Sequence, residues 1–244
     1  MAIFIEPNNI VKCLSILEET LQRGSYFIQL GAEKGDHLKV YFTHRSSQEF
    51  KKINEKIIQI HDLKEQDKNE EELLFSNYMK GTILMLKHID SSKDFYYKNA
   101  HNGKVLNTFL LSSGYLFLQA LKDHSYGFIE KRRVNFSLFL LLLVTSEYTK
   151  SSKNLSVFLK YSSNEIVIPE PTIAQLKIVL QEIKEGEVSF WEKEFMLESR
   201  KIIDKLGLQY FIDVLSIILD LKIVERDYLK SAYCELLKSV HVKV

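Results

Sequence analysis

The chain has 244 residues, of which 45% are hydrophobic and 27% charged, with 33 Lys and Arg against 32 Asp and Glu. This composition excludes intrinsic disorder as the default state, because a chain of this length and apolar content can bury a sizeable core. The balanced charge argues against capture of nucleic acid by the whole surface, since neutralising phosphates requires a basic face.

The N-terminal residues predict one short apolar segment and one helix. Residues 1–5 are apolar and stop at a Glu-Pro pair, which indicates a short edge strand or a packed terminus. Apolar residues then recur every three or four positions, as in an amphipathic helix. Asn8 or Asn9 caps this helix, and Gly24 ends it.

A β-hairpin and two more helices are expected next. Apolar residues alternate on both sides of a turn within 26–42, which predicts the hairpin. Ser46 or Ser47 opens a helix with apolar residues at helical spacing. A further helix is expected over about 70–87.

The middle of the chain predicts one helix and two further hairpins. Segments 95–98 and 104–106 flank an Asn-Gly pair, which is typical of a hairpin turn. Helical spacing resumes over 109–121. Segments 155–159 and 166–168 could form the arms of another hairpin.

The most apolar segment is 134–144, with the sequence VNFSLFLLLLV. As a helix it would extend about 17 Å, well short of the ~30 Å hydrocarbon core of a bilayer. Thr145, Ser146 and Glu147 follow at once. We therefore expect a buried helix in the centre of a globular protein and no membrane partner.

The C-terminal region predicts four helices after a Pro-Glu-Pro sequence at 169–171, which is the best candidate for a domain boundary. Ser189 and Glu192 have the spacing of a capping box, and Gly207 is a helix stop. The expected helices cover residues 172–185, 189–206, 208–221 and 227–240.

Together these elements predict a helix-dominated α+β fold. We expect about eight or nine helices, two or three small β-hairpins in the first 170 residues, and an all-helical C-terminal unit. A mixed helix and hairpin domain would cover 1–168, with its central buried helix at 134–148. The helical unit would cover 172–244, unless the chain forms one continuous domain.

Motifs for catalysis and cofactor binding are missing from the sequence. The seven histidines are at least seven residues apart, so no local metal pair exists, and the nine glycines form no phosphate-binding loop. The most suggestive polar group is His37 with His44 and Arg45, at the arms of the first hairpin. An enzyme site there is our second alternative, although polar residues on the wet face of a hairpin would look the same. We expect no metal and no cofactor.

Lys131, Arg132 and Arg133 form the best basic cluster, near Tyr126 and Phe128. Cations beside aromatic rings are typical of surfaces that bind phosphates and bases. A solvated loop before a buried helix would look the same, and a helix N-terminus disfavours cations. Nucleic acid is therefore an alternative partner.

Adjacent bulky aromatic residues occur in the C-terminal region. Neighbouring residues on a helix point about 100° apart, so both members of a pair are covered only if the helix is central or a partner covers its second side. The core and the partner interpretations remain open. The candidate partner-binding residues are Phe190, Trp191, Tyr210 and Phe211.

We therefore predict a non-catalytic protein–protein interaction or assembly subunit of a larger complex. Its partner would be another protein or a second copy of itself. A nucleic-acid-binding accessory factor is the alternative. Cys13 and Cys234 lie far apart with no regular framework, which favours the reducing cytoplasm.

Overall fold

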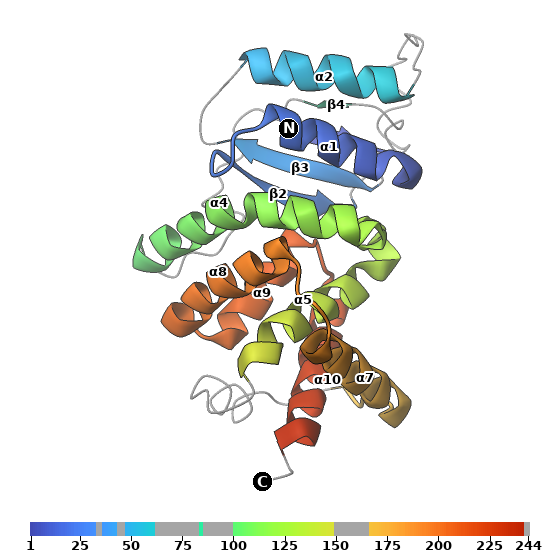
Figure 1. The fold of residues 1–244 in the computed structure, drawn as a ribbon, viewed down its shortest axis with the longest axis vertical. Coiled ribbons are helices and arrows are strands. Elements are labelled where there is room, and N and C mark those ends of the chain that lie inside the picture. The colour runs from blue at the N-terminus through green and yellow to red at the C-terminus, as the bar shows by residue number, and fades with distance from the viewer. Residues whose placement is uncertain (33–35, 43–46, 62–82, 85–99, 149–165, 242–244) are drawn as a thin grey trace. The chain divides into compact units, whose positions relative to one another are not determined.

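A computed structural model of the protein describes residues 1–32, 36–42, 47–61, 83–84, 100–148 and 166–241. Helices dominate it, and a small antiparallel sheet lies in the N-terminal part (Figure 1). The prediction of a helix-dominated α+β fold is confirmed. No helix in the described ranges is long and apolar enough to cross a membrane.

The chain forms two compact units, Met1–Arg132 and Arg133–Val244. The sequence predicts the division at the Pro-Glu-Pro sequence, but Pro169 and Pro171 instead flank the start of helix α7 (Glu170–Glu185), where proline is well tolerated. The central helix α5 (Arg133–Tyr148) contacts α7 and the helices that follow it, so it belongs to the second unit.

The sheet of the first unit has the strand order β2-β3-β1-β4 and is antiparallel throughout. The predicted hairpin is confirmed as β2 (Tyr26–Gly31) and β3 (His37–Phe42). Strand β1 (Ala2–Phe4) lies between β3 and β4 (Ile83–Leu84), so it is an interior strand and not an edge strand. Its complete burial explains why it is apolar throughout.

The helices of the first unit are α1 (Ile10–Thr20), α2 (Ser47–His61) and α4 (Ala100–Asp123). Short 3-10 turns cover Pro7–Asn9, Ser125–Phe128 and Glu130–Arg132. Helix α4 packs against β2 (Figure 1). A Cβ atom on Gly114 would lie 2.3 Å from the Tyr26 carbonyl oxygen, so only glycine allows this approach.

Three predicted elements of the first 170 residues need correction. Residues 83–84 form a strand, not the end of a helix over 70–87, whose other residues lie outside the described ranges. Residues 104–106 lie in α4, where the first turn continues through the Asn-Gly pair. Residues 166–168 form no strand, and the other arms of both expected hairpins lie outside the described ranges.

The second unit is helical in its described residues. Helix α5 is confirmed as core, because Phe136, Leu138 and all five residues from Leu140 to Val144 are buried. After α7 follow α8 (Phe190–Leu206), α9 (Leu208–Ile218) and α10 (Ile223–His241). Gly207 separates α8 from α9 with a φ of 93°, a conformation that favours glycine. The four predicted C-terminal helices are all present.

Candidate functional site

Helix α8 begins with a complete capping box. The Ser189 hydroxyl accepts a hydrogen bond from the Glu192 backbone N–H at 3.5 Å, and the Ser189 backbone N–H donates to the Glu192 carboxylate at 2.6 Å. This reciprocal pair satisfies two backbone donors that a helix start otherwise leaves without a partner. The first turn of α8 is thereby fixed, as the sequence predicts.

Two adjacent aromatic residues at this helix start have opposite environments. Trp191 is 6% exposed, whereas Phe190 is 68% exposed. The difference follows from helix geometry, because consecutive residues point about 100° apart. Trp191 is therefore a buried core residue of α8, and the Phe190 ring is left on the surface.

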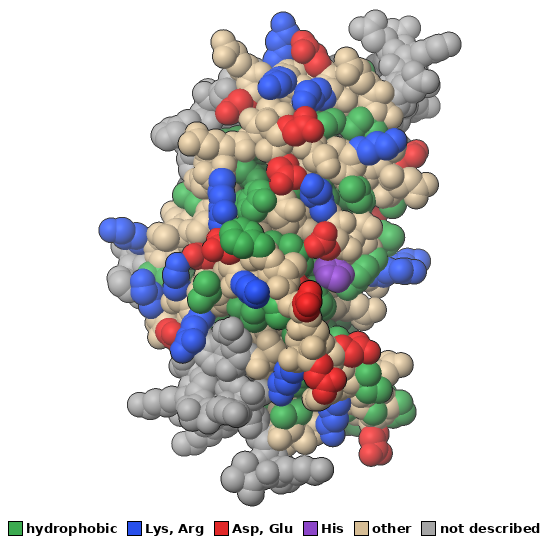
Figure 2. Space-filling view, viewed as in Figure 1, with side chains coloured by type: hydrophobic (Ala, Val, Ile, Leu, Met, Phe, Trp, Pro, Cys, Tyr) green, Lys and Arg blue, Asp and Glu red, His purple; other side chains and the backbone are tan. Residues whose placement is uncertain are grey.

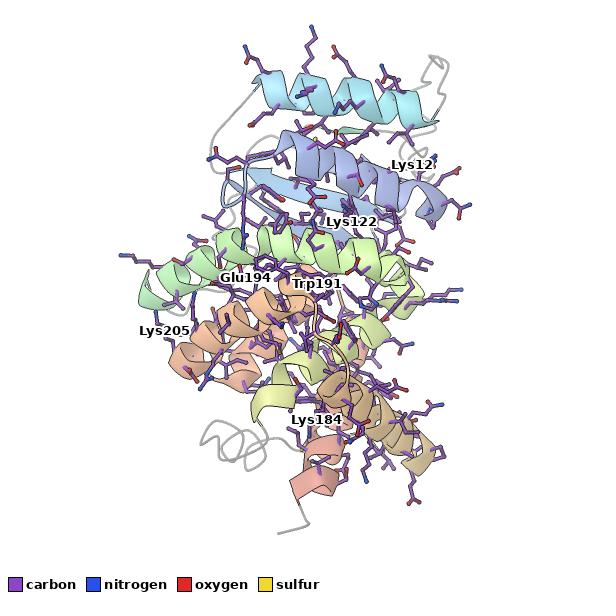
Figure 3. The ribbon with its side chains drawn as sticks, viewed as in Figure 1. Lys12, Lys122, Lys184, Trp191, Glu194 and Lys205 are labelled. Atoms are coloured by element: carbon purple, nitrogen blue, oxygen red, sulfur yellow. The ribbon has the colours of Figure 1, made fainter. Side chains whose placement is uncertain are left out.

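A second exposed apolar residue lies on the same side of α8. Leu197 is 54% exposed and follows Phe190 by seven residues, or almost two full turns. Glu194 and Lys201 each follow one of these apolar residues by four positions, about one helical turn, so they lie on the same side of α8. We call the four residues Phe190, Glu194, Leu197 and Lys201 the outer face of α8 (Figure 3 labels Glu194 on this helix).

Helix α9 carries the other predicted aromatic pair. Phe211 is completely buried, and its ring centroid lies 6.4 Å from that of Phe195. Tyr210 is half-buried, and burial raises the pKa of its phenol. Of the four predicted partner-binding residues, Trp191 and Phe211 are therefore core residues, and Phe190 is the one with a largely exposed ring.

The three residues of the predicted basic cluster differ in their exposure to solvent. Lys131 and Arg132 are exposed, but Arg133 is 1% exposed. The Arg133 Nη1 atom lies 3.5 Å from the Leu219 carbonyl oxygen and 3.4 Å from a carboxylate oxygen of Asp220. These acceptors stand just beyond the end of α9, where backbone carbonyls lack helical partners and attract cations.

This placement corrects the predicted phosphate-binding surface. The Arg133 guanidinium is part of the interior of the second unit. Of the three predicted phosphate ligands, Lys131 and Arg132 therefore remain as candidates. Basic and acidic side chains are mixed on the face of the molecule that Figure 2 shows. Such mixing gives little attraction for a polyanion.

His37, the central residue of the predicted histidine site, is not available on the surface. His37 is buried in β3, its ring centroid is 4.5 Å from that of Phe4, and a Cβ atom on Gly31 would lie 2.3 Å from its Nε2 atom. His37 therefore packs as part of the sheet. His44 and Arg45 lie outside the described residues. Among the residues that are described, no group of three His, Cys, Asp or Glu side chains could hold a metal ion.

A polar cluster that the sequence did not reveal connects α1 to α4. The Glu18 carboxylate accepts hydrogen bonds from Lys122 at 2.6 Å, from Gln119 at 2.7 Å and from the Tyr115 hydroxyl at 3.4 Å. The Arg23 guanidinium lies 5.0 Å from the centroid of the Tyr115 ring. The three α4 residues share one side of that helix, but about 100 residues separate them from Glu18, so no local pattern indicates the contact.

The comparisons with known proteins add no relative. The sequence matches no protein-family model, and no curated protein matches it. Function is therefore inferred from the geometry of the surface alone. The most informative part of that surface is the outer face of α8.

Proposed function

We propose that this protein is a non-catalytic protein–protein interaction or assembly subunit of a larger complex, and that it contacts its partner through the outer face of α8. The observation that carries the proposal is the 68% exposure of Phe190 beside the buried Trp191. Aromatic residues are enriched at protein interfaces, where covering one ring removes a large apolar area from water.

The Phe190 ring is also held on a well-ordered support. The capping box fixes the first turn of α8, and Trp191 anchors that turn in the core. A side chain on a preorganised backbone loses less conformational entropy when a partner binds. This support distinguishes Phe190 from Val167, which is 93% exposed but lies in no helix or strand.

We also propose a cytoplasmic location. Cys13 and Cys234 are both buried thiols, in α1 and α10. Buried thiols outside any disulfide are typical of proteins from reducing compartments. This part of the proposal is independent of the partner.

Affinity purification from the native source tests the interaction. We expect a protein partner to be recovered with the wild type, and Phe190→Ala to reduce its recovery at least about tenfold, since an interfacial aromatic residue commonly contributes ~2 kcal/mol. The matched control is Ile178→Ala on α7, because Ile178 is similarly exposed at 59%. Equal recovery with both variants would contradict the proposal.

The nucleic-acid alternative is tested in the same experiment. Lys131 and Arg132 are exposed and stand next to each other, so they are available to phosphates. If the wild type retains nucleic acid at physiological salt and Lys131→Glu with Arg132→Glu releases it, the alternative replaces our proposal. We expect no retained nucleic acid.

A further inference from the structure

The charges along α8 are separated by sign. Residues 190–198 include three glutamates and one lysine, whereas residues 199–206 include three cations and one aspartate. Such a separation complements the helix dipole, and it also makes the helix complementary to an antiparallel copy of itself. In Figure 3, Lys205 lies at one end of α8, and Glu194 lies between it and Trp191.

The apolar and charged residues share one side of the helix. At about 100° per residue, Phe190, Glu194, Leu197 and Lys201 lie within about 60° of one another. Met196, Ser199 and Ile203 lie on the opposite, buried side. The exposure of the side chains agrees with this placement, since Phe190, Leu197 and Lys201 are exposed and Glu194 is half-buried.

We propose that the outer face of α8 pairs with the same face of a second copy of this chain, antiparallel about a twofold axis close to Leu197. The proposal rests on the proposed function and names the partner. Glu194 and Lys201 are placed symmetrically about the middle of the face, so each Glu194 would lie opposite Lys201 of the other copy. The two Leu197 side chains would meet at the axis, which satisfies the self-complementarity of a twofold interface.

The same arrangement covers the exposed aromatic ring. Phe190 would lie opposite Lys205 of the second copy, whose alkyl chain and ammonium group can pack over an aromatic face. In the single chain Lys201 contacts Glu198 at 2.5 Å on its own helix, and because the Lys201 side chain is 66% exposed, its ammonium group is also accessible to a carboxylate of a second copy. With two apolar side chains from each copy, the interface is small, which is typical of weak and reversible association.

Sedimentation velocity on the full chain over a series of concentrations tests this pairing. We expect the wild type to dimerise reversibly, and Glu194→Lys or Lys201→Glu to weaken dimerisation about tenfold or more, because each variant places like charges together twice. An equimolar mixture of the two variants should regain the dimer, since every facing pair in the mixed species is again of opposite sign. Lys184→Glu, an exposed charge reversal on α7, is the control and should behave as the wild type.

Three results would overturn the pairing: a wild type that stays monomeric at every concentration, single variants that dimerise as the wild type does, or a mixture that gains no dimer. Melting curves of each variant confirm that it is folded, and Leu197→Gln provides a second uncharged test. A monomeric wild type that still loses a different protein partner through Phe190→Ala would reject the self-pairing and leave the proposed function standing.

Discussion

The Glu18 carboxylate and the Lys122 ammonium group are 2.6 Å apart and connect α1 to α4 in the first unit. Both side chains are partly shielded from water, at 30% and 24% exposure. The hydrogen bond from Lys122 is the largest of the effects that hold the pKa of Glu18 below its usual range. The folded protein therefore favours the ionised carboxylate more strongly than the unfolded chain does.

This contact predicts a loss of stability in acid. Because the folded-state pKa is lowered, the contribution of Glu18 is complete above the ordinary glutamate pKa of about 4.3 and is lost as the pH falls through the folded-state pKa. Chemical denaturation at several pH values should show a shallower acid decline for Glu18→Gln than for the wild type. Lys122→Met should also flatten it, and an unchanged decline in both variants would show that the pair is not coupled to folding.

Gly114 should not tolerate a side chain. Its missing Cβ lets α4 approach the Tyr26 carbonyl, so Gly114→Ala should lower the free energy of unfolding by about 1–3 kcal/mol. Helix propensity alone predicts the opposite sign, since alanine is favoured over glycine by about 1 kcal/mol. Ser112→Ala is the control two residues away and should change stability by less than about 0.5 kcal/mol in a thermal or urea melt. A stabilised Gly114→Ala variant would mean that α4 lies farther from the sheet.

Arg133 should be a stability residue and not a ligand-binding one. Replacing it by alanine removes the donor to Leu219 and Asp220 and leaves a cavity, which should cost about 2–4 kcal/mol of unfolding free energy. Lys131→Ala and Arg132→Ala, at exposed positions, should each stay within about 0.5 kcal/mol of the wild type. Equal effects of all three substitutions in urea titrations would contradict the burial of the Arg133 guanidinium.

Substitutions of the two adjacent aromatic residues of α8 should have different effects on the free energy of unfolding in urea titrations. Trp191→Ala should lower the free energy of unfolding by about 3–5 kcal/mol, because it empties a core position. Phe190→Ala should change it by less than about 0.5 kcal/mol, because its ring is already in water. Similar losses in both variants would place Phe190 in the core too.

The sequence predicts those elements that local chemistry determines. The apolar run of α5 had to be buried, the Ser189 and Glu192 spacing marks the start of α8, and Gly207 marks its end. The first hairpin follows from its alternation. Each of these signals lies within a few residues, where helix and strand periods differ clearly.

The sequence does not predict features that depend on contacts between residues far apart in the chain. The Asn-Gly pair near the start of α4 favours a turn by itself, but the helix runs through it. Arg133 looks like the third member of a basic surface until the end of α9 supplies its acceptors. The partners of Glu18 are about 100 residues away, so their contact becomes visible in the folded chain alone.

Photo-crosslinking at position 190 is the most direct test of the central claim that the exposed end of α8 contacts another polypeptide. A photoreactive phenylalanine analogue in place of Phe190 should form a nuclease-resistant adduct with a second polypeptide chain, while the same analogue at the similarly exposed Ile178 should form little or none. Either a second copy or a different protein in that adduct agrees with the account. No adduct at position 190, equal adducts at both positions, or an adduct that nuclease removes would contradict it.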